Sequence, residues 1–158
     1  QVEAIPHIKR LRIHTRLPVV IPNRVTPSLV SLLKNTRLKA TIVLHINHAN
    51  EIDENFASAL EPLRDARIPL FNQSVLLKEI NDDSDILIAL SEKMFDVGIT
   101  PYYLHLFDAV QGAAHFDVSE ERAVNIANEM LANLPGFLMP KLVREIAGQA
   151  NKTPINLT

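Results

Sequence analysis

The feature that most constrains this chain is a regular alternation of short apolar runs with amphipathic segments. Runs rich in β-branched and aromatic residues recur about every 30 residues, which is the length of a strand plus a crossover helix. They occupy residues 8–13, 40–46, 68–73 and 99–106, and a further β-like run covers 137–146. Strands that are apolar on both faces, alternating with amphipathic helices, indicate a parallel sheet covered by helices. The sequence therefore predicts an α/β fold.

Between these runs, apolar residues recur at helical spacing in segments 26–33, 53–66, 85–95 and 119–134. The first segment opens with Thr26 as N-cap before Pro27, and the third follows a capping cluster at residues 81–84. The second opens with an acidic pair at Asp53 that suits the positive end of a helix dipole, and in the fourth Ser119 precedes an acidic first turn. The result is about four βα units and a terminal strand, too few for a closed eight-stranded barrel but matching its later half. We expect residues 1–134 to form the later half of a partial (βα) barrel, and residues 135–158 to form a C-terminal strand and tail.

Composition describes an ordinary globular domain. Hydrophobic residues make up 47% of the 158 residues and the formal net charge is −2. No basic stripe suggests nucleic acid, and no apolar run approaches the ~20 residues that cross a bilayer. We therefore expect neither a nucleic-acid nor a membrane partner. The chain has no cysteine, so disulfides are excluded and we expect a cytoplasmic protein.

Polar residues follow the strand signals, where parallel sheets collect their functional groups. The guanidinium of Arg16 suits a phosphate or a carboxylate, although an ion pair with a neighbouring acid is an alternative. Asn72 and Gln73 end an otherwise apolar strand, where a buried amide needs partners. The sequence HINH beginning at His45 invites a zinc interpretation, but residues three apart on a strand point to opposite faces. We predict no metal ligand in the chain.

Four segments in order, residues 12–26, 71–82, 100–108 and 137–157, resemble the lysine 2,3-aminomutase family of radical S-adenosylmethionine (SAM) enzymes. The likeness is strongest to the branch whose product, β-lysine, modifies elongation factor P. The resemblance implies an open six-stranded (βα) barrel, of which this chain supplies the later strands and a C-terminal cap strand. It also implies an isomerase that converts L-lysine to β-lysine by migration of the 2-amino group, with pyridoxal 5′-phosphate (PLP), SAM and a [4Fe-4S] cluster as cofactors.

The resemblance also implies roles for particular residues. Lys152 would form the Schiff base with PLP, and Asp108 and Glu145 would hold the ε-ammonium of the substrate lysine. The family has aspartate where Glu145 stands, and often tyrosine where His105 stands. The expected contacts to PLP or SAM are Arg16, His45, Asn72 and Gln73, whereas His7, His14 and His115 are expected to be structural.

The absence of cysteine bears on the cluster. A [4Fe-4S] cluster in such an enzyme needs three cysteine thiolates, and this chain supplies none. We therefore expect the chain to be the C-terminal part of a longer enzyme, inactive alone, with the N-terminal part as its partner. Homo-oligomerisation is left open.

Two other functions remain open at this point. One is a non-radical (βα)-barrel lyase in which Lys152 forms a Schiff base with the substrate itself. The other is a binding module without catalytic activity.

Overall fold

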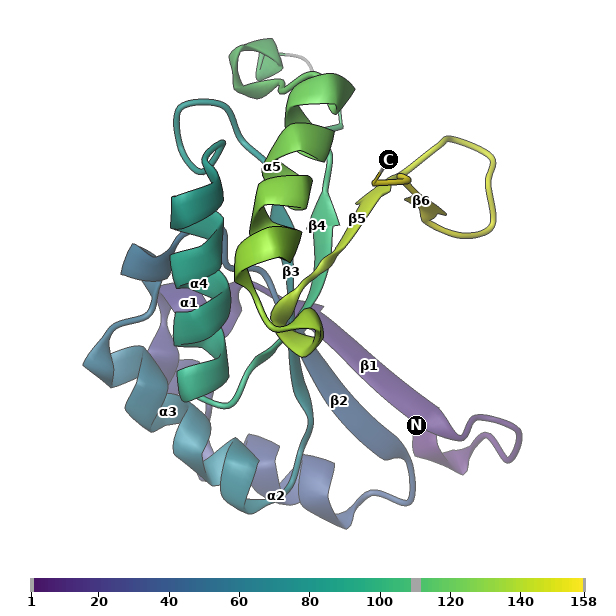
Figure 1. Ribbon diagram of the computed structural model, residues 1–158. Helices are drawn as coiled ribbons and strands as arrows, with labels where there is room; N and C mark the ends of the chain where they lie inside the picture. The colour runs from purple at the N-terminus through teal and green to yellow at the C-terminus, as the bar shows by residue number, and fades with distance from the viewer. Residues whose placement is uncertain (1, 109–111, 158) are drawn as a thin grey trace.

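The computed structural model describes residues 2–108 and 112–157 (Figure 1). Its centre is a single sheet whose six strands lie side by side in chain order, β1 to β6. The first five strands run parallel and β6 pairs antiparallel with β5. The strands are β1 (Arg10–Thr15), β2 (Lys39–Leu44), β3 (Leu70–Val75), β4 (Thr100–His105), β5 (Lys141–Arg144) and β6 (Thr153–Pro154).

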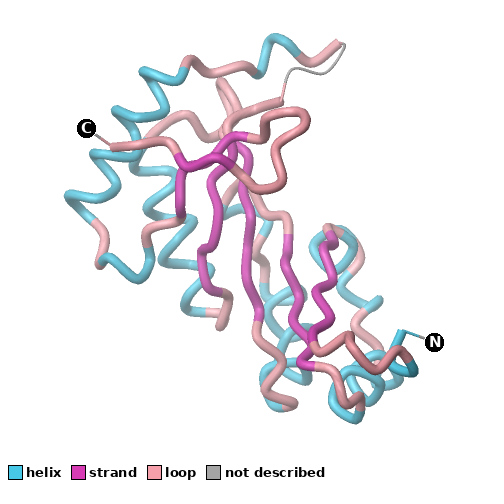
Figure 2. The backbone as a smooth tube through the Cα atoms, turned by 90° about the vertical axis from the view of Figure 1, so that its right-hand side faces the viewer, coloured by secondary structure: helices cyan, strands magenta, loops and turns pink. Residues whose placement is uncertain are grey.

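A helix connects each parallel strand to the next, and the helices cover one face of the sheet (Figures 1 and 2). The four connecting helices are α2 (Pro27–Asn35), α3 (Glu54–Asp65), α4 (Ser84–Asp96) and α5 (Glu120–Asn133). The shorter elements are α1 (Leu17–Val20) and the 3₁₀ turns η1 (Val2–Ala4), η2 (Pro22–Arg24), η3 (Ala49–Glu51), η4 (Ala114–Phe116) and η5 (Gly136–Leu138). The order of strands and helices confirms the predicted α/β fold with successive βα units.

Local side-chain hydrogen bonds explain where the helices begin. The side chains of Thr26, Asp53 and Ser119 each accept a hydrogen bond from a backbone N–H of the first turn, which satisfies a donor that the helix leaves free. The predicted N-cap at Thr26 is confirmed. The predicted capping cluster at residues 81–84 is also confirmed, because Asp83 caps α4 in the same way.

The hydrophobic core lies between the helices and the sheet. Its fully buried members include Leu44, Phe56, Leu90, Leu104 and Met130. In β3, burial alternates so that Leu70, Asn72 and Ser74 are buried while Phe71, Gln73 and Val75 are only half-buried. Because successive strand residues point to opposite faces, the second set lies on the face without helices. That open face, turned toward the viewer in Figure 2, is the surface on which a site can form.

The predicted terminal strand was too long. Residues 136–138 form η5, and β5 begins only at Lys141. Pro135 and Pro140 carry no backbone N–H for a sheet ladder, which accounts for the delayed start. The two-residue strand β6 was not predicted, because it is too short to carry a periodic pattern.

Candidate functional site

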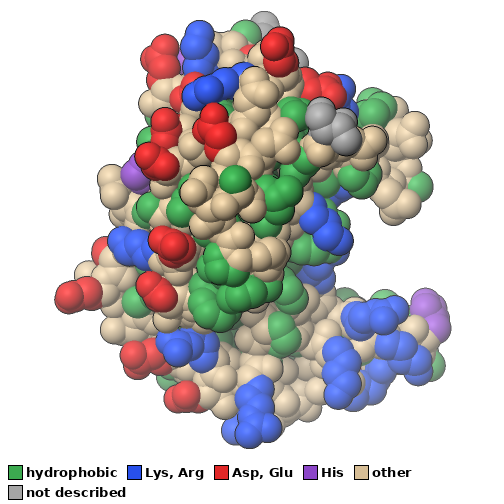
Figure 3. All heavy atoms as spheres, in the orientation of Figure 1, with side chains coloured by type: hydrophobic (Ala, Val, Ile, Leu, Met, Phe, Trp, Pro, Cys, Tyr) green, Lys and Arg blue, Asp and Glu red, His purple; other side chains and the backbone are tan. Residues whose placement is uncertain are grey.

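A cavity of about 620 Å³ lies on the open face of the sheet, between β1 and the loop of residues 145–152 that joins β5 to β6. In the space-filling view it opens as a notch, with Lys and Arg side chains gathered on its lower side (Figure 3). Its volume is in the range of small-molecule sites. The lining residues are Arg12, His14, Gln73, Tyr103, Glu145, Ile146, Gln149, Ala150, Asn151 and Lys152.

Lys152 reaches this cavity because the chain folds back on itself. β6 pairs with the end of β5, with Thr153 opposite Arg144 and Pro154 opposite Val143. This pairing returns the chain across the carboxyl end of the sheet, directly beside His105 at the end of β4. The Lys152 amine therefore lies 3.1 Å from His105 Nε2.

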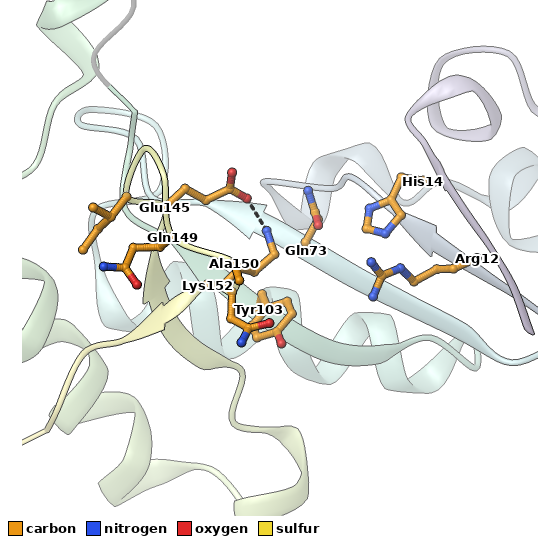
Figure 4. Close-up of a pocket in the computed structure, with 10 residues that line it drawn as sticks. Arg12, His14, Gln73, Tyr103, Glu145, Gln149, Ala150 and Lys152 are labelled. Carbon is orange, nitrogen blue, oxygen red and sulfur yellow. Dashed lines mark hydrogen bonds and ion pairs between the residues drawn. The ribbon is translucent and has the colours of Figure 1, made fainter.

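Two further groups hold the Lys152 amine. It forms an ion pair with the carboxylate of Glu145 (Figure 4) and lies 5.5 Å from the centroid of the Tyr103 ring. The Lys152 side chain is 23% exposed. The hydrogen bond that Glu145 accepts from Lys152 lowers the pKa of the carboxyl group, and the positive charge of Lys152 adds to that effect. A carboxylate, a ring nitrogen and an aromatic face thus surround one primary ammonium.

His105 is buried, with 5% of its surface exposed. Burial lowers its pKa to about 4, and the positive charge of Lys152 acts in the same direction. Glu145 and Asp108 oppose the change but do not reverse it. At neutral pH the imidazole is therefore uncharged, and one of its ring nitrogens can accept a hydrogen bond.

Across the cavity from Lys152 lie Gln73 of β3 and Arg12 and His14 of β1 (Figure 4). The ring of His14 packs edge-on against that of His45, with 5.9 Å between centroids. Burial lowers the pKa of both histidines, and each also lies near an arginine, Arg12 for His14 and Arg16 for His45. Both rings are therefore favoured in the neutral state.

Within residues 2–108 and 112–157, two buried side-chain atoms have no hydrogen-bond partner: His45 Nε2 and Gln73 Oε1. A buried polar atom without a partner loses its hydration without compensation. Both residues were predicted to contact a cofactor. PLP and SAM are rich in donors and acceptors, and the Lys152 amine beside them could attach to the carbonyl group of PLP. The residues present therefore fit such groups.

Asn72 and Arg16 each have hydrogen-bond partners within the protein. Asn72 points to the helix-covered face, where it accepts a hydrogen bond from Ile46 N (2.8 Å) and donates to Ile46 O (3.0 Å) and Ser74 Oγ (2.9 Å). Its amide is thus satisfied within the protein, and we correct its assignment to a structural one. Arg16 donates to His45 O at 2.9 Å and forms an ion pair with Glu51. The alternative of an ion pair with a neighbouring acid is the one observed for Arg16.

The two predicted substrate carboxylates differ in position. Glu145 lines the cavity. Asp108 is exposed, three residues beyond β4, and near enough to influence the pKa of His105. Residues 109–111, which follow it, lie outside the described part of the chain.

Sequence reasoning missed several residues of the cavity. His14 was expected to be structural but lines it, as do Arg12, Tyr103 and Gln149. The alternation in RLRIHT was the available signal, because it places Arg12 and His14 on the same face of β1.

Several known proteins that are similar in sequence to this chain are named L-lysine 2,3-aminomutase. No protein-family model matches the chain. The chain is 54% identical to the L-lysine 2,3-aminomutase of Escherichia coli over 157 residues, and 56% identical to that of Haemophilus influenzae over 151 residues. These alignments cover 99% and 96% of this chain but 46% and 45% of the relatives. The Clostridium subterminale L-lysine 2,3-aminomutase is 36% identical over 96% of this chain and 36% of its own length.

Over nearly its whole length, the chain is similar to proteins named L-lysine 2,3-aminomutase. It spans less than half the length of these first two relatives and matches their C-terminal portion. The branch that modifies elongation factor P remains a prediction.

A solved structure supports the fold. The model superposes on a radical SAM methyltransferase from Sphaerobacter thermophilus with a TM-score of 0.59, at 11% identity, over 84% of this chain and 40% of that one. Such a likeness concerns the fold alone. It supports the predicted fold, the later βα units of a partial barrel.

Within residues 2–108 and 112–157, no helix has the length and apolar character to cross a membrane. Within the same residues, no group of three or more histidine or acidic side chains could hold a metal ion.

Proposed function

We propose that this chain is the C-terminal part of an L-lysine 2,3-aminomutase, an isomerase that moves the 2-amino group of L-lysine to carbon 3. One observation carries the proposal: in a chain 54% identical to such an enzyme, a lysine amine lies in a cavity at the carboxyl end of a parallel sheet, between a carboxylate and a neutral histidine. PLP, SAM and a [4Fe-4S] cluster are the proposed cofactors, with the cluster ligands in an N-terminal part of the same enzyme.

Lys152 is the proposed point of attachment for PLP. When bound, PLP supplies a π system that stabilises an unpaired electron next to the migrating nitrogen, and SAM with the cluster supplies the radical. The residues of this chain would bind and orient the cofactors and the substrate, and would shield them from water. Gln73 Oε1 and His45 Nε2, which have no partner within the described residues, would each form a hydrogen bond to a cofactor.

Glu145 is the proposed receptor for an ammonium group. Its carboxylate already binds the primary ammonium of Lys152, which has the same chemistry as the ε-ammonium of free L-lysine. If Lys152 is attached to PLP, its charge no longer occupies Glu145, and the carboxylate can accept the substrate instead. Asp108 is proposed as the second carboxylate of that receptor, and a cytoplasmic location as the setting.

The aromatic residues of the open face would limit access of water to the site. The rings of Tyr102 and Tyr103 lie 3.9 Å apart between centroids, and Phe71 packs against Tyr102 at 5.5 Å. Tyr103 is the one of these three rings that lines the cavity, and it would keep water from one side of the Lys152 amine.

The test of this proposal is the position of a covalent pyridoxyl group. The protein is incubated with PLP, reduced with borohydride, digested and analysed by mass spectrometry. We expect the added mass on Lys152. Lys141 is the matched control, because it is an exposed lysine of the neighbouring strand β5.

We expect the variant Lys152→Ala to lose the label and Lys141→Ala to retain it. A label on Lys141, or an unchanged label in Lys152→Ala, would contradict the proposed site.

A further inference from the structure

We propose that His105 is a positioning residue for Lys152, acting as a permanent hydrogen-bond acceptor that aims the amine into the cavity. The inference rests on the proposed function, because Lys152 is there the residue that attaches PLP. It assigns a task to the position at which the family often has tyrosine.

The first step is the geometry around the amine. A lysine ammonium has three N–H donors and a flexible four-carbon stem. Glu145 takes one donor and His105 Nε2, at 3.1 Å, takes a second. Two of its donors are thus held, one by His105 at the end of β4 and one by Glu145 in the loop after β5, so the amine cannot rotate freely. The Tyr103 ring lies beside it, 5.5 Å from the nitrogen to the ring centroid. An amine held in this way loses little further freedom when it attacks a carbonyl carbon.

The second step is the charge state of His105. A protonated imidazole has no acceptor nitrogen and would repel the ammonium. The titratable or charged groups near the ring are Lys152, Glu145, Asp108 and His45, and the Tyr103 ring packs edge-on at 5.8 Å between centroids. Burial and the charge of Lys152 outweigh the two carboxylates and lower the pKa of His105 to about 4. The ring therefore remains an acceptor throughout the physiological pH range.

The third step is the chemistry that His105 serves. The nitrogen of Lys152 forms a bond to the aldehyde carbon of PLP, and the aldehyde oxygen leaves as water with two hydrogens from the amine. The extra proton of the ammonium passes to solvent. His105 neither gains nor loses a proton in this balance, because a base with a pKa of about 4 is too weak to deprotonate an ammonium. Its contribution is the orientation of the nitrogen.

The experiment compares three variants with the unmodified protein. His105→Phe keeps a ring but removes the acceptor, His105→Gln keeps an uncharged acceptor, and His115→Phe alters an exposed histidine outside the cavity. The rate of PLP attachment is followed by visible absorbance and by borohydride trapping. We expect His105→Phe to slow attachment about tenfold or more, the effect of losing one hydrogen bond to a charged group. His105→Gln should remain within about threefold of the unmodified protein, and His115→Phe should match it.

A second measurement needs no PLP. In protein labelled with ¹⁵N-histidine, we expect Nε2 of His105 to be the unprotonated nitrogen at neutral pH. In Lys152→Met, the pKa of His105 should rise, because one positive charge is removed. A proton on Nε2, or an unchanged pKa, would overturn the inference, and this measurement decides the matter if His105→Phe does not fold.

The outcomes also separate the two proposals. If PLP attaches to Lys152 at the same rate in His105→Phe as in the unmodified protein, the positioning role is refuted and the proposed function stands. If no lysine of the unmodified protein carries the pyridoxyl group, the proposed function fails, while the nitrogen resonances still test the contact between His105 and Lys152.

Discussion

Acidification should destabilise this protein through His105. The pKa of His105 falls from the ordinary 6.5 to about 4 in the folded state, chiefly because the ring is buried and secondarily because Lys152 is positively charged. As the pH falls below 6.5, the unfolded chain takes up a proton at this histidine while the folded chain does not. Proton uptake by the unfolded state alone lowers the free energy of unfolding. The loss should continue down to about pH 4, where the folded state is protonated as well.

The size of the effect follows from the difference between the two pKa values. Each pKa unit corresponds to about 1.4 kcal/mol at 25 °C. Between pH 6.5 and about 4, His105 should thus lower the free energy of unfolding by up to roughly 3 kcal/mol. That is a large part of the roughly 5–15 kcal/mol that stabilises a typical domain. The depressed pKa values of His14 and His45 act in the same direction over this range, and that of Glu145 does so at more acidic pH, below its ordinary value of 4.5, so the total loss should be greater.

The assay must separate the contribution of His105 to the free energy of unfolding from the contributions of the other histidines. Urea unfolding, followed by far-ultraviolet circular dichroism, gives the free energy of unfolding at a series of pH values. His105→Gln has no group that titrates at this position, whereas His14, His45 and Glu145 are retained. We expect the difference in free energy between the two proteins to change by roughly 2–3 kcal/mol over this pH range. Parallel curves for the two proteins would refute the conclusion that His105 is held neutral by burial.

Two further predictions concern Asn72, which lies against the backbone of Ile46, and Asp108, which lies beyond the end of β4. Asn72→Ala should lower the free energy of unfolding by about 1–3 kcal/mol, because it leaves the buried N–H of Ile46 without its partner, whereas Ile46 O keeps the Ser74 hydroxyl as a donor. An effect no larger than that of the exposed control Asn55→Ala would contradict the structural role. In the full-length enzyme, Asp108→Asn should raise the KM for L-lysine about tenfold, since it removes one charge opposite an ammonium, and should leave the PLP absorbance intact. An unchanged KM, or an equal change in the exposed control Asp117→Asn, would count against Asp108.

The helices and strands were accessible to sequence reasoning because their signals are local. The hydrogen bonds of Thr26, Asp53 and Ser119 each span three residues, so the residues that form them are close in the chain before it folds. The βα alternation has the same property, since each unit carries its own periodic pattern. The resemblance to a known family added Lys152 and Glu145 as candidate site residues, and the two are also close in sequence.

Assignment of the strand-end amides shows where sequence reasoning stopped. Asn72 and Gln73 are adjacent polar residues at the end of an apolar strand, and nothing in that order tells which one faces a cavity. Strand pairing and the helix layer decided it: Asn72 lies against the backbone of Ile46 and Gln73 lines the open face. One residue of register would exchange their roles.

The sequence by itself determined the α/β class, the order of the elements and the caps that begin the helices, because these depend on periodicity and on contacts between near neighbours. Only the tertiary structure decided the environment of Lys152. Its amine meets His105 across 47 positions of sequence, through a two-residue strand that has no pattern of its own. The low pKa of His105 likewise arises from burial by distant segments, and burial of that kind exists only once the chain has folded.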